Sequence, residues 1–389
     1  MGAPFVIIGA GIAGLTLALE LASRKLPIYL FERADVLTEI GAGLQLPPNA
    51  SRVLARHPAV AEGLEKVSVE PSALTFRNGI SGETIASMPL GREAVARWGS
   101  PYRLVHRADL QAVLLKAVRE TGIPLTMDAE FVSVRQAATG LSVTIRINGR
   151  DESLDAAALI GADGVNSAVR KAVHGDGAIF AGDTAWRALL PHDKTASIFQ
   201  GNDTRLWLGP GAHLVTYPVS GGGAVNAVAV TPGEVPKADA IDRCFRRWHP
   251  EVRSVVASAP WQPWPLHERP ARAGWAAGRI TLVGDAAHAM VPHLAQGAAQ
   301  AIEDADVLAR CLEKASDPAE AFKAYERLRR PRVMRIQAEA RANGRIYRMP
   351  WPASMARNQV MRMLGPERLM ARVDWLYAAT GLEDSVNRG

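Results

Sequence analysis

The chain has 389 residues, of which 48% are hydrophobic and 22% are charged, and its formal net charge is +6. This composition is typical of a folded globular protein and excludes a disordered chain. The length exceeds what one hydrophobic core usually supports, so two domains are expected. The positive charge is spread thinly apart from arginines near residues 327–335, and no nucleic-acid partner is expected.

The two cysteines, Cys244 and Cys311, supply neither a metal cluster nor a disulfide framework, which is usual in a reducing cytoplasm. The apolar amino terminus lacks the basic segment of a signal peptide. No uninterrupted apolar run reaches the roughly 18 residues of a membrane span. We therefore expect a cytoplasmic protein, monomeric or homodimeric, with no membrane partner.

The amino terminus carries the strongest pattern of the chain. Residues 5–8 are apolar and β-branched, as in a strand buried on both faces. Gly9, Gly11 and Gly14 follow, and residues 12–24 then have the pattern of a helix. In such a G-x-G-x-x-G turn the first glycine permits the turn, the second lets a pyrophosphate approach the backbone, and the third lets helix and strand pack closely.

A second apolar run completes this βαβ unit. It covers residues 27–31 and ends in Glu32, whose carboxylate can accept hydrogen bonds from a ribose diol. The helix amino terminus offers unpaired N–H groups to phosphates. The pattern predicts dinucleotide binding, but it does not distinguish NAD from FAD.

Two further segments each have two interpretations. Residues 41–49 form a loop rich in glycine and proline, which either contacts a flat ligand through exposed backbone or only connects its neighbours. Arg107 begins a helix that ends near Glu120, where a cation is unfavourable. It either contacts a phosphate or a flavin edge, or it pairs with Asp109 or Glu120.

Strand patterns follow through the middle of the chain. Residues 73–88 are expected to form a hairpin that turns at Asn78-Gly79, and residues 124–154 a meander. Residues 158–162 have the composition of a buried parallel strand, which ends in Asp163-Gly164. Ligands of open α/β sheets bind at such carboxyl ends.

The amino-acid composition of the chain changes near residue 175. Tryptophans and alternating strands over residues 175–274 predict an antiparallel sheet in a second domain, including a short strand at 198–200. His213 and Tyr217 fall on one face of a strand, about 13 Å apart. They either line a pocket of aromatic size or belong to an exposed or internally bonded polar face.

Residues 279–283 form another buried strand, which ends in Gly284-Asp285. His288 and His293 have the wrong spacing for a metal site on one helix face. The acids of the following helix are expected to be solvated or to cap it, namely Glu303, Asp304 and Asp306. Asp317-Pro318 opens a further helix, and the remainder, with Trp351 and Trp375, is expected to wrap the first domain.

Three separated motifs therefore occur in order: residues 9–14 with 32–33, residues 161–164, and residues 284–285 with 292–300. Together they resemble the flavin-dependent aromatic hydroxylases of the p-hydroxybenzoate hydroxylase fold, in particular the salicylate and 6-hydroxynicotinate hydroxylases. The resemblance covers most of the chain, including residues 329–332 and 374–377.

The resemblance implies an α/β fold with a Rossmann-like FAD-binding domain of the GR2 type, an inserted antiparallel-sheet substrate domain and carboxyl-terminal helices. The FAD-binding domain would comprise residues 1–72, 98–175 and 275–345. The substrate domain would comprise residues 73–97 and 176–274, followed by a helical segment over 346–389.

The resemblance also implies FAD, with Glu32 on the adenosine ribose, Asp285 on the ribityl chain, and Asp163 serving both FAD and NAD(P)H. A helix that begins near residues 295–297 would direct N–H groups at the flavin pyrimidine, where reduction leaves negative charge. The expected cofactor-binding residues are Gly9, Gly11, Ile12, Ala13, Gly14, Glu32, Arg33, Gly43, Leu44, Arg107, Val132, Asp163, Gly284, Asp285, Ala295, Gln296, Gly297 and Ala298.

The implied reaction hydroxylates a small aromatic or heteroaromatic acid with O₂ and NAD(P)H, NADH being favoured, through a flavin C4a-hydroperoxide. The site must exclude water and help to deprotonate a phenolic oxygen. Similar enzymes place His and Tyr on this strand, so the expected catalytic residues are His213, Tyr217 and Pro292. The expected substrate residues are Gln45, Trp186, Arg187, His213, Tyr217 and His293.

Some residues depart from the family pattern. Ala289 stands where many relatives have proline, His293 stands where an apolar or aromatic residue is common, and Trp186-Arg187 replaces Tyr or Phe with Arg. These residues would lie near the substrate, so they bear on its identity and not on the cofactor. Two alternatives remain: a related oxidase or epoxidase acting on an apolar substrate, and a binding protein without redox chemistry.

Overall fold

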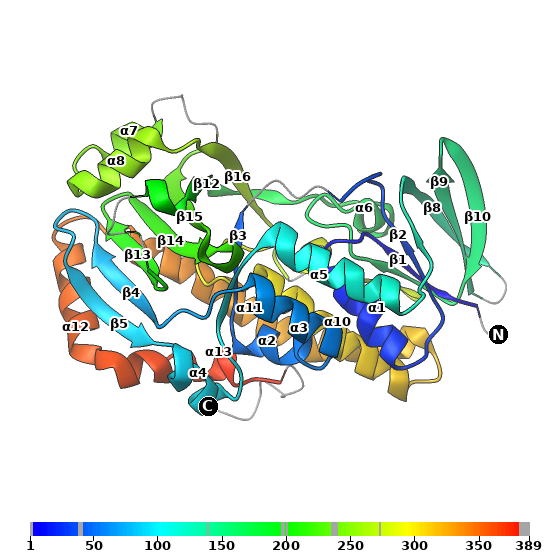
Figure 1. Cartoon of the computed structure of the whole chain (residues 1–389). Coiled ribbons are helices and arrows are strands. Elements are labelled where there is room, and N and C mark those ends of the chain that lie inside the picture. Colours follow the sequence, from blue (N-terminus) through cyan, green and yellow to red (C-terminus); the bar gives the residue numbers. More distant parts are fainter. Residues whose placement is uncertain are drawn as a thin grey trace.

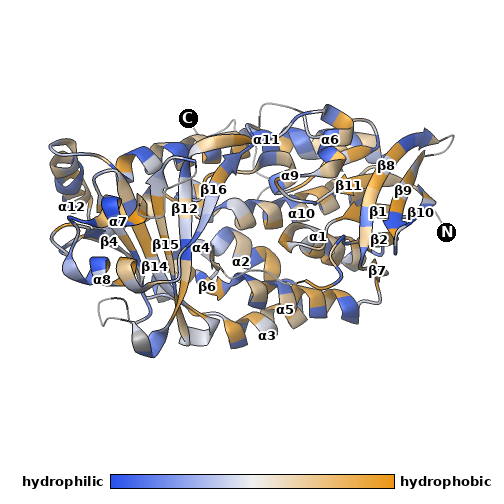
Figure 2. Cartoon of the chain, turned by 90° about the horizontal axis from the view of Figure 1, so that it is seen from above, coloured by the Kyte–Doolittle hydropathy of each residue, from blue (hydrophilic) through white to orange (hydrophobic). Residues whose placement is uncertain are grey.

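The computed structural model describes residues 3–37, 42–137, 140–195, 199, 201–234, 240–271 and 274–380. Within these ranges the strands form four sheets in a mixed α/β fold (Figure 1). Seen from above, α12 (Ala353–Ala371) lies at one end of the molecule and the sheet of β8–β10 lies at the other (Figure 2). Of the strand expected at residues 198–200, only Phe199 is among the described residues.

A parallel five-stranded sheet organises one half of the molecule, in the order β17-β11-β1-β2-β7. Its strands are β1 (Phe5–Ile8), β2 (Ile28–Phe31), β7 (Leu125–Thr126), β11 (Ala158–Gly161) and β17 (Ile280–Leu282). The βαβ unit predicted at the amino terminus is confirmed, because β1 and β2 pair in parallel through α1 (Ile12–Ser23). Helix α1 packs on α5 (Arg107–Glu120) and α10 (Gly297–Lys314).

Two small antiparallel sheets flank this core. One contains β8 (Ala129–Ala137), β9 (Gly140–Ile147) and β10 (Arg150–Ala156), and the other pairs β3 (Gly43–Leu46) with β6 (Arg103–His106). The predicted meander is therefore confirmed for β8 to β10. Residues 124–127 were wrongly included in it, because β7 pairs in parallel with β2 instead.

A seven-stranded sheet dominates the other half, in the order β16-β12-β15-β14-β13-β4-β5. Its strands are β4 (Ala73–Asn78), β5 (Thr84–Pro89), β12 (Ile179–Pro191), β13 (Thr204–Gly209), β14 (Ala212–Val219), β15 (Ala224–Pro232) and β16 (Gln262–Glu268). The predicted hairpin at Asn78-Gly79 is confirmed by the antiparallel pair of β4 and β5. Successive residues of each strand face opposite sides, so one face packs in an apolar cluster with the helices α7 (Ala240–Phe245) and α8 (Pro250–Ser258), while the other faces a cavity.

The remaining helices are α2 (Pro48–Leu54), α3 (Pro58–Val67), α4 (Gly91–Trp98), α6 (Ala168–His174), α7 (Ala240–Phe245), α8 (Pro250–Ser258), α9 (Asp285–His288), α11 (Pro318–Tyr347) and α13 (Asp374–Tyr377). Asp317 caps α11 as predicted, because its carboxylate accepts from the N–H of Ala319 at 3.3 Å. The expectation that the last segment wraps the first domain is wrong for α12, which packs on β5 of the large sheet. None of the helices in the described ranges has both the length and the apolarity to cross a membrane.

Candidate active site

A cavity of about 1160 Å³ runs from the carboxyl ends of β1 and β11 to the inner face of the seven-stranded sheet. This volume exceeds the roughly 300–1000 Å³ of pockets for one small ligand, so there is room for a dinucleotide and a second molecule. Among the residues predicted from the sequence, the cavity is lined by Gly9, Gly11, Ile12, Ala13, Glu32, Arg33, Gly43, Leu44, Gln45, Arg107, Asp163, Arg187, His213, Tyr217, Asp285, Pro292, His293, Ala295, Gln296, Gly297 and Ala298.

Four predicted residues do not line this cavity. Trp186 points from β12 into the opposite apolar cluster, where its Nε1 donates to Thr231 Oγ1 at 2.9 Å. Val132 lies at an irregularity in the pairing of β8 and β9, and its neighbours Glu130 and Phe131 line the cavity instead. Trp186 therefore lies away from the predicted substrate site, and the cofactor contact of Val132 stays a prediction at a position whose neighbours line the cavity.

The other two predicted residues that do not line the cavity are Gly14 and Gly284, which affect how the backbone packs next to it. A Cβ on Gly14 would lie 1.8 Å from the carbonyl oxygen of Gly9, so the missing side chain permits close packing of helix and turn. Gly284 has a φ of 60°, and its N–H donates to Asp304 Oδ2 at 2.9 Å. Both glycines support the site without lining it.

Two helix amino termini meet the cavity at positions that lack side chains. Gly11 precedes α1, and Gly297 begins α10, as the sequence predicted. A Cβ built on either glycine would meet no atom within 4 Å, so the space over both backbones is open. Unpaired N–H groups at such termini favour phosphates and other anionic groups.

Acids surround this end of the cavity. Glu32 accepts from the N–H of Ala10 at 2.7 Å and from that of Ala34 at 3.0 Å, which holds its carboxylate beside the glycine turn. Asp163 accepts from Ser167 Oγ at 2.6 Å, and burial raises its pKa despite such hydrogen bonds. Asp285 is exposed on the cavity wall at the first turn of α9.

Arg107 also lines the cavity, from the first turn of α5. The position on the wall favours the interpretation in which Arg107 contacts a ligand.

The inner end of the cavity brings the predicted pair together. His213, Val215 and Tyr217 alternate with the apolar-cluster residues of β14, and all three line the cavity. Burial, with His293 and Arg348, lowers the pKa of His213 well below its usual value, so the imidazole is neutral near pH 7. Burial raises the pKa of Tyr217, which keeps its hydroxyl protonated.

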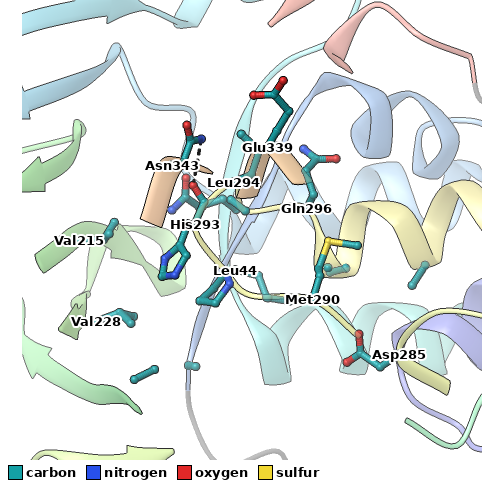
Figure 3. Close-up of a pocket in the computed structure, with 18 of the residues that line it drawn as sticks. Leu44, Val215, Val228, Asp285, Met290, His293, Leu294, Gln296, Glu339 and Asn343 are labelled. Carbon is teal, nitrogen blue, oxygen red and sulfur yellow. Dashed lines mark hydrogen bonds between the residues drawn. The ribbon is translucent and has the colours of Figure 1, made fainter. Parts of the chain in front are cut away.

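A second imidazole stands beside the first. The rings of His213 and His293 have centroids 5.0 Å apart at 72°. Burial and the charge of Arg348 lower the pKa of His293 to about 4. A Cβ on Gly344 of α11 would lie 2.5 Å from this ring, so the glycine makes room for it. Figure 3 shows His293 pointing into the cavity between Val215 and Leu44.

Several residues that were not predicted from the sequence hold the inner end of the cavity in place. Tyr347 Oη and Asn343 Nδ2 donate to the His293 carbonyl at 3.3 and 3.5 Å. Asp183 Oδ2 lies 3.9 Å from His293 Nε2 and pairs with Arg348. These residues are distant from one another in the chain, and no motif marks them.

A buried ionic network lies behind the cofactor end. Glu303, Asp304 and Asp306 are each no more than 1% exposed, so the expectation of solvated acids is wrong. Asp304 accepts from His288 at 2.6 Å and from Arg329 at 2.8 Å, and Glu303 contacts both Arg329 and Arg332. The burial of these acids was not predicted from the sequence, because both arginines come from the next helix. No group of three metal-ligating side chains occurs within the described ranges.

Residues 3–340 match the family model described as FAD binding domain. The 3-amino-4-hydroxybenzoate 2-monooxygenase of Streptomyces cremeus is 38% identical over 97% of this chain and 96% of its own length. The 3-hydroxybenzoate 6-hydroxylase 1 of Aquipseudomonas alcaligenes is 34% identical over 97% of this chain and 98% of its own. The chain belongs to the FAD-dependent aromatic hydroxylases.

Solved structures of similar proteins agree with this family. Klebsiella pneumoniae HpxO, complexed with FAD and uric acid, superposes with a TM-score of 0.84 at 26% identity, over 99% of this chain and 98% of its own. A salicylate hydroxylase substrate complex gives a TM-score of 0.79 at 22% identity over 99% of both chains, which supports the fold alone. The hydroxylase described here therefore has the predicted GR2-type fold.

Proposed function

We propose that this protein is an FAD-dependent monooxygenase that uses NAD(P)H and O₂ to hydroxylate a small aromatic or heteroaromatic acid. The observation that carries the proposal is a single cavity lined both by the open glycines Gly11 and Gly297 and by the polar pair His213 and Tyr217. Relatives named for 3-hydroxybenzoate, 3-amino-4-hydroxybenzoate and 6-hydroxynicotinate support this class of substrate.

The residues present fit FAD. The open backbones at the starts of α1 and α10 would hold the pyrophosphate and the flavin ring, Glu32 the adenosine ribose, and Asp285 the ribityl chain. Bound FAD would supply the electron transfer from NAD(P)H to O₂ and the activation of O₂, of which one atom enters the ring and the other leaves as water. We assign the seven-stranded sheet to a substrate domain and the parallel sheet to the FAD-binding domain.

His213 would accept or hydrogen-bond the phenolic proton of the substrate. Its Nδ1 is buried and has no hydrogen-bond partner among the described residues, and its lowered pKa keeps the imidazole neutral and able to accept a hydrogen bond near pH 7. Tyr217, protonated because burial raises its pKa, would donate to the substrate oxygen from the same face of β14. Electron density at the ring would increase as the phenolic proton is drawn away.

The walls of the inner end would exclude water from the reacting atoms. They are largely apolar, and they include Leu206, Val215, Val228 and Val230 of the seven-stranded sheet. Pro292 and Met290 close the side towards the cofactor end. A dry chamber favours transfer of oxygen to the ring over the loss of reduced oxygen to solvent.

The test is a screen of hydroxylated benzoates and pyridine carboxylates with the yellow holoenzyme. NADH and NADPH consumption is compared with and without each acid, and products are identified by mass spectrometry. At least one acid is expected to speed consumption, more with NADH than with NADPH, and to yield a product heavier by one oxygen atom. Absence of any hydroxylated product would refute the proposed substrate class.

A further inference from the structure

The cavity reaches the protein surface at two separate places. Around the carboxyl ends of the parallel strands, the exposed lining residues are Arg33, Glu130, Asn166, Ala168 and Asp285, which we call the sheet mouth. Elsewhere, the exposed lining residues are Arg335 and Glu339 of α11, Ala353, Ala356 and Val360 of α12, and Arg372, which we call the helical mouth. The two mouths belong to different elements of the fold.

Figures 1 and 2 place α12 beside the seven-stranded sheet and α6, which contributes Ala168 to the sheet mouth, towards the opposite end of the molecule. The buried residues His213, Tyr217 and His293 lie in the cavity between them. A bound dinucleotide with its phosphates at Gly11 would occupy the sheet mouth. A small molecule would then need the other opening to reach His213.

One face of α11 runs from the helical mouth to the inner end of the cavity, which holds His213 and Tyr217 and which we call the chamber. Glu339, Asn343 and Tyr347 are spaced four residues apart, so they follow one another along the same side of the helix. Asn343 and Tyr347 contact the carbonyl of His293, at the inner end of this row. Figure 3 shows Glu339, Asn343 and His293 along this side of the cavity.

The charges of the two mouths differ. At the helical mouth, the Arg335 guanidinium lies 3.9 Å from the centroid of the Trp375 ring, and Arg372 is a second exposed cation on the lining. At the sheet mouth, the exposed charged residues are the acids Glu130 and Asp285 and the cation Arg33. The helical mouth thus exposes two cations and one acid, Glu339, whereas the sheet mouth exposes two acids and one cation. The excess of cations favours the approach of a carboxylate at the helical mouth.

We propose that the helical mouth, between α11 and α12, is the route by which the aromatic acid enters and its hydroxylated product leaves. Arg335, Arg372 and Trp375 select an anionic aromatic molecule there before it reaches the chamber. This inference rests on the proposed function, because it concerns the substrate of that same site.

A route and a binding site respond differently to a blocking substitution. Narrowing a route raises the barrier equally for entrance and exit, so the association and dissociation rates decrease together and the dissociation constant stays unchanged. Altering the binding site changes the dissociation constant. This difference makes the proposal measurable without turnover.

The experiment uses stopped-flow mixing of the oxidised holoenzyme with 3-hydroxybenzoate or salicylate, followed by the change in flavin absorbance. In Ala356→Trp both rate constants should decrease about tenfold with the dissociation constant preserved. Ala353→Trp gives a second obstruction of the same mouth. The matched control is Gln359→Trp, because Gln359 is exposed on α12 but does not line the cavity.

A charge variant tests selection at the mouth. Arg372→Gln should decrease the association rate and weaken its dependence on salt concentration, with flavin content unchanged. Unchanged rates in both tryptophan variants, or a change in only one of the two rate constants with a matching change in the dissociation constant, would overturn the route and leave the proposed function intact. Failure of every acid to perturb the flavin of the unaltered protein would instead overturn the proposed function, and the route with it.

Discussion

Glu303 of α10 and Arg332 of α11 form a bidentate ion pair in the interior, in which Arg332 Nη2 and Nε donate to the two carboxylate oxygens at 2.8 and 2.9 Å. Arg332 also donates to the carbonyls of Trp375 and Leu376 at 3.0 and 2.8 Å. The helix whose start faces the cofactor end is thus tied to the chain that follows α12. Burial alone would raise the pKa of Glu303, but the charges of Arg332 and Arg329 lower it to about 2.

Glu303→Gln should therefore destabilise the fold strongly. The neutral amide leaves Arg329 and Arg332 in the interior with less compensating charge, and the free energy of unfolding should decrease by about 3–5 kcal/mol. Urea unfolding measures this change. Glu320→Gln is the control, because Glu320 pairs with Lys323 at the surface and is 66% exposed, and a change of less than about 1 kcal/mol is expected there.

The lowered pKa of Glu303 also predicts that the folded state loses stability at acid pH. Because its pKa is depressed in the folded state, its stabilisation is complete above the ordinary value of 4.5 and is lost as the pH decreases towards 2. Glu303→Gln should lack this part of the pH dependence. An equal slope in variant and unaltered protein over that range would show that the pKa of Glu303 is not lowered in the folded state.

The lowered pKa of His293 predicts a second pH range, above that of Glu303, in which the free energy of unfolding depends on pH. Its pKa is lowered from 6.5 to about 4, so between these values the unfolded chain binds a proton that the folded protein does not. The free energy of unfolding should decrease as the pH falls through this range, by up to about 3 kcal/mol. His293→Leu should flatten the slope in urea titrations across this range, whereas His267→Leu, at an exposed position outside the cavity, should not.

Asp285→Ala should purify with depleted flavin. The carboxylate lies exposed on the cavity wall at the start of α9, and loss of its hydrogen bonds to a ribityl chain should weaken FAD binding by roughly tenfold or more. Absorbance ratios of the purified protein measure occupancy. Asp151→Ala, on the distant strand β10, should retain full flavin. Full occupancy in Asp285→Ala would remove this residue from the cofactor site.

Tyr217→Phe should separate hydroxylation from cofactor binding. The ring stays in place beside Gly43, where a Cβ would lie 2.5 Å from it, but the donor to the substrate oxygen is lost. Turnover to hydroxylated product should decrease about a hundredfold with flavin content preserved. Tyr29→Phe, on the surface of β2, provides the matched loss of a hydroxyl. Loss of flavin in Tyr217→Phe would indicate a structural role instead.

The parts of the site that were predicted from the sequence depend on local patterns. The glycines of the first turn and Glu32 belong to one βαβ unit, and His213 and Tyr217 share a strand face by the two-residue period alone. The two-residue period of a strand determines which residues share a face, but it does not determine which face lines the cavity. The resemblance assigned both Trp186 and Arg187 to the substrate, but neighbouring strand residues face opposite sides and only Arg187 lines the cavity.

The parts that were missed depend on how distant elements pack. Glu303 was taken for a solvated acid because its partners lie on α11, and only the packing of α10 against α11 buries them together. Asp183 and Arg348 meet near His293 from β12 and the end of α11. The helical mouth likewise needs the placement of α12 against β5, which no local pattern indicates.

The central claim is that the cofactor groove and the chamber of His213 and Tyr217 form one monooxygenase site. The most direct measurement is a turnover of the holoenzyme with NADH, 3-hydroxybenzoate or salicylate, and isotope-labelled O₂, analysed by mass spectrometry. The expected product is a hydroxylated ring that carries one labelled oxygen atom per molecule. Label-free hydroxylated product, or NADH oxidation with an unaltered acid for every compound tested, would contradict it.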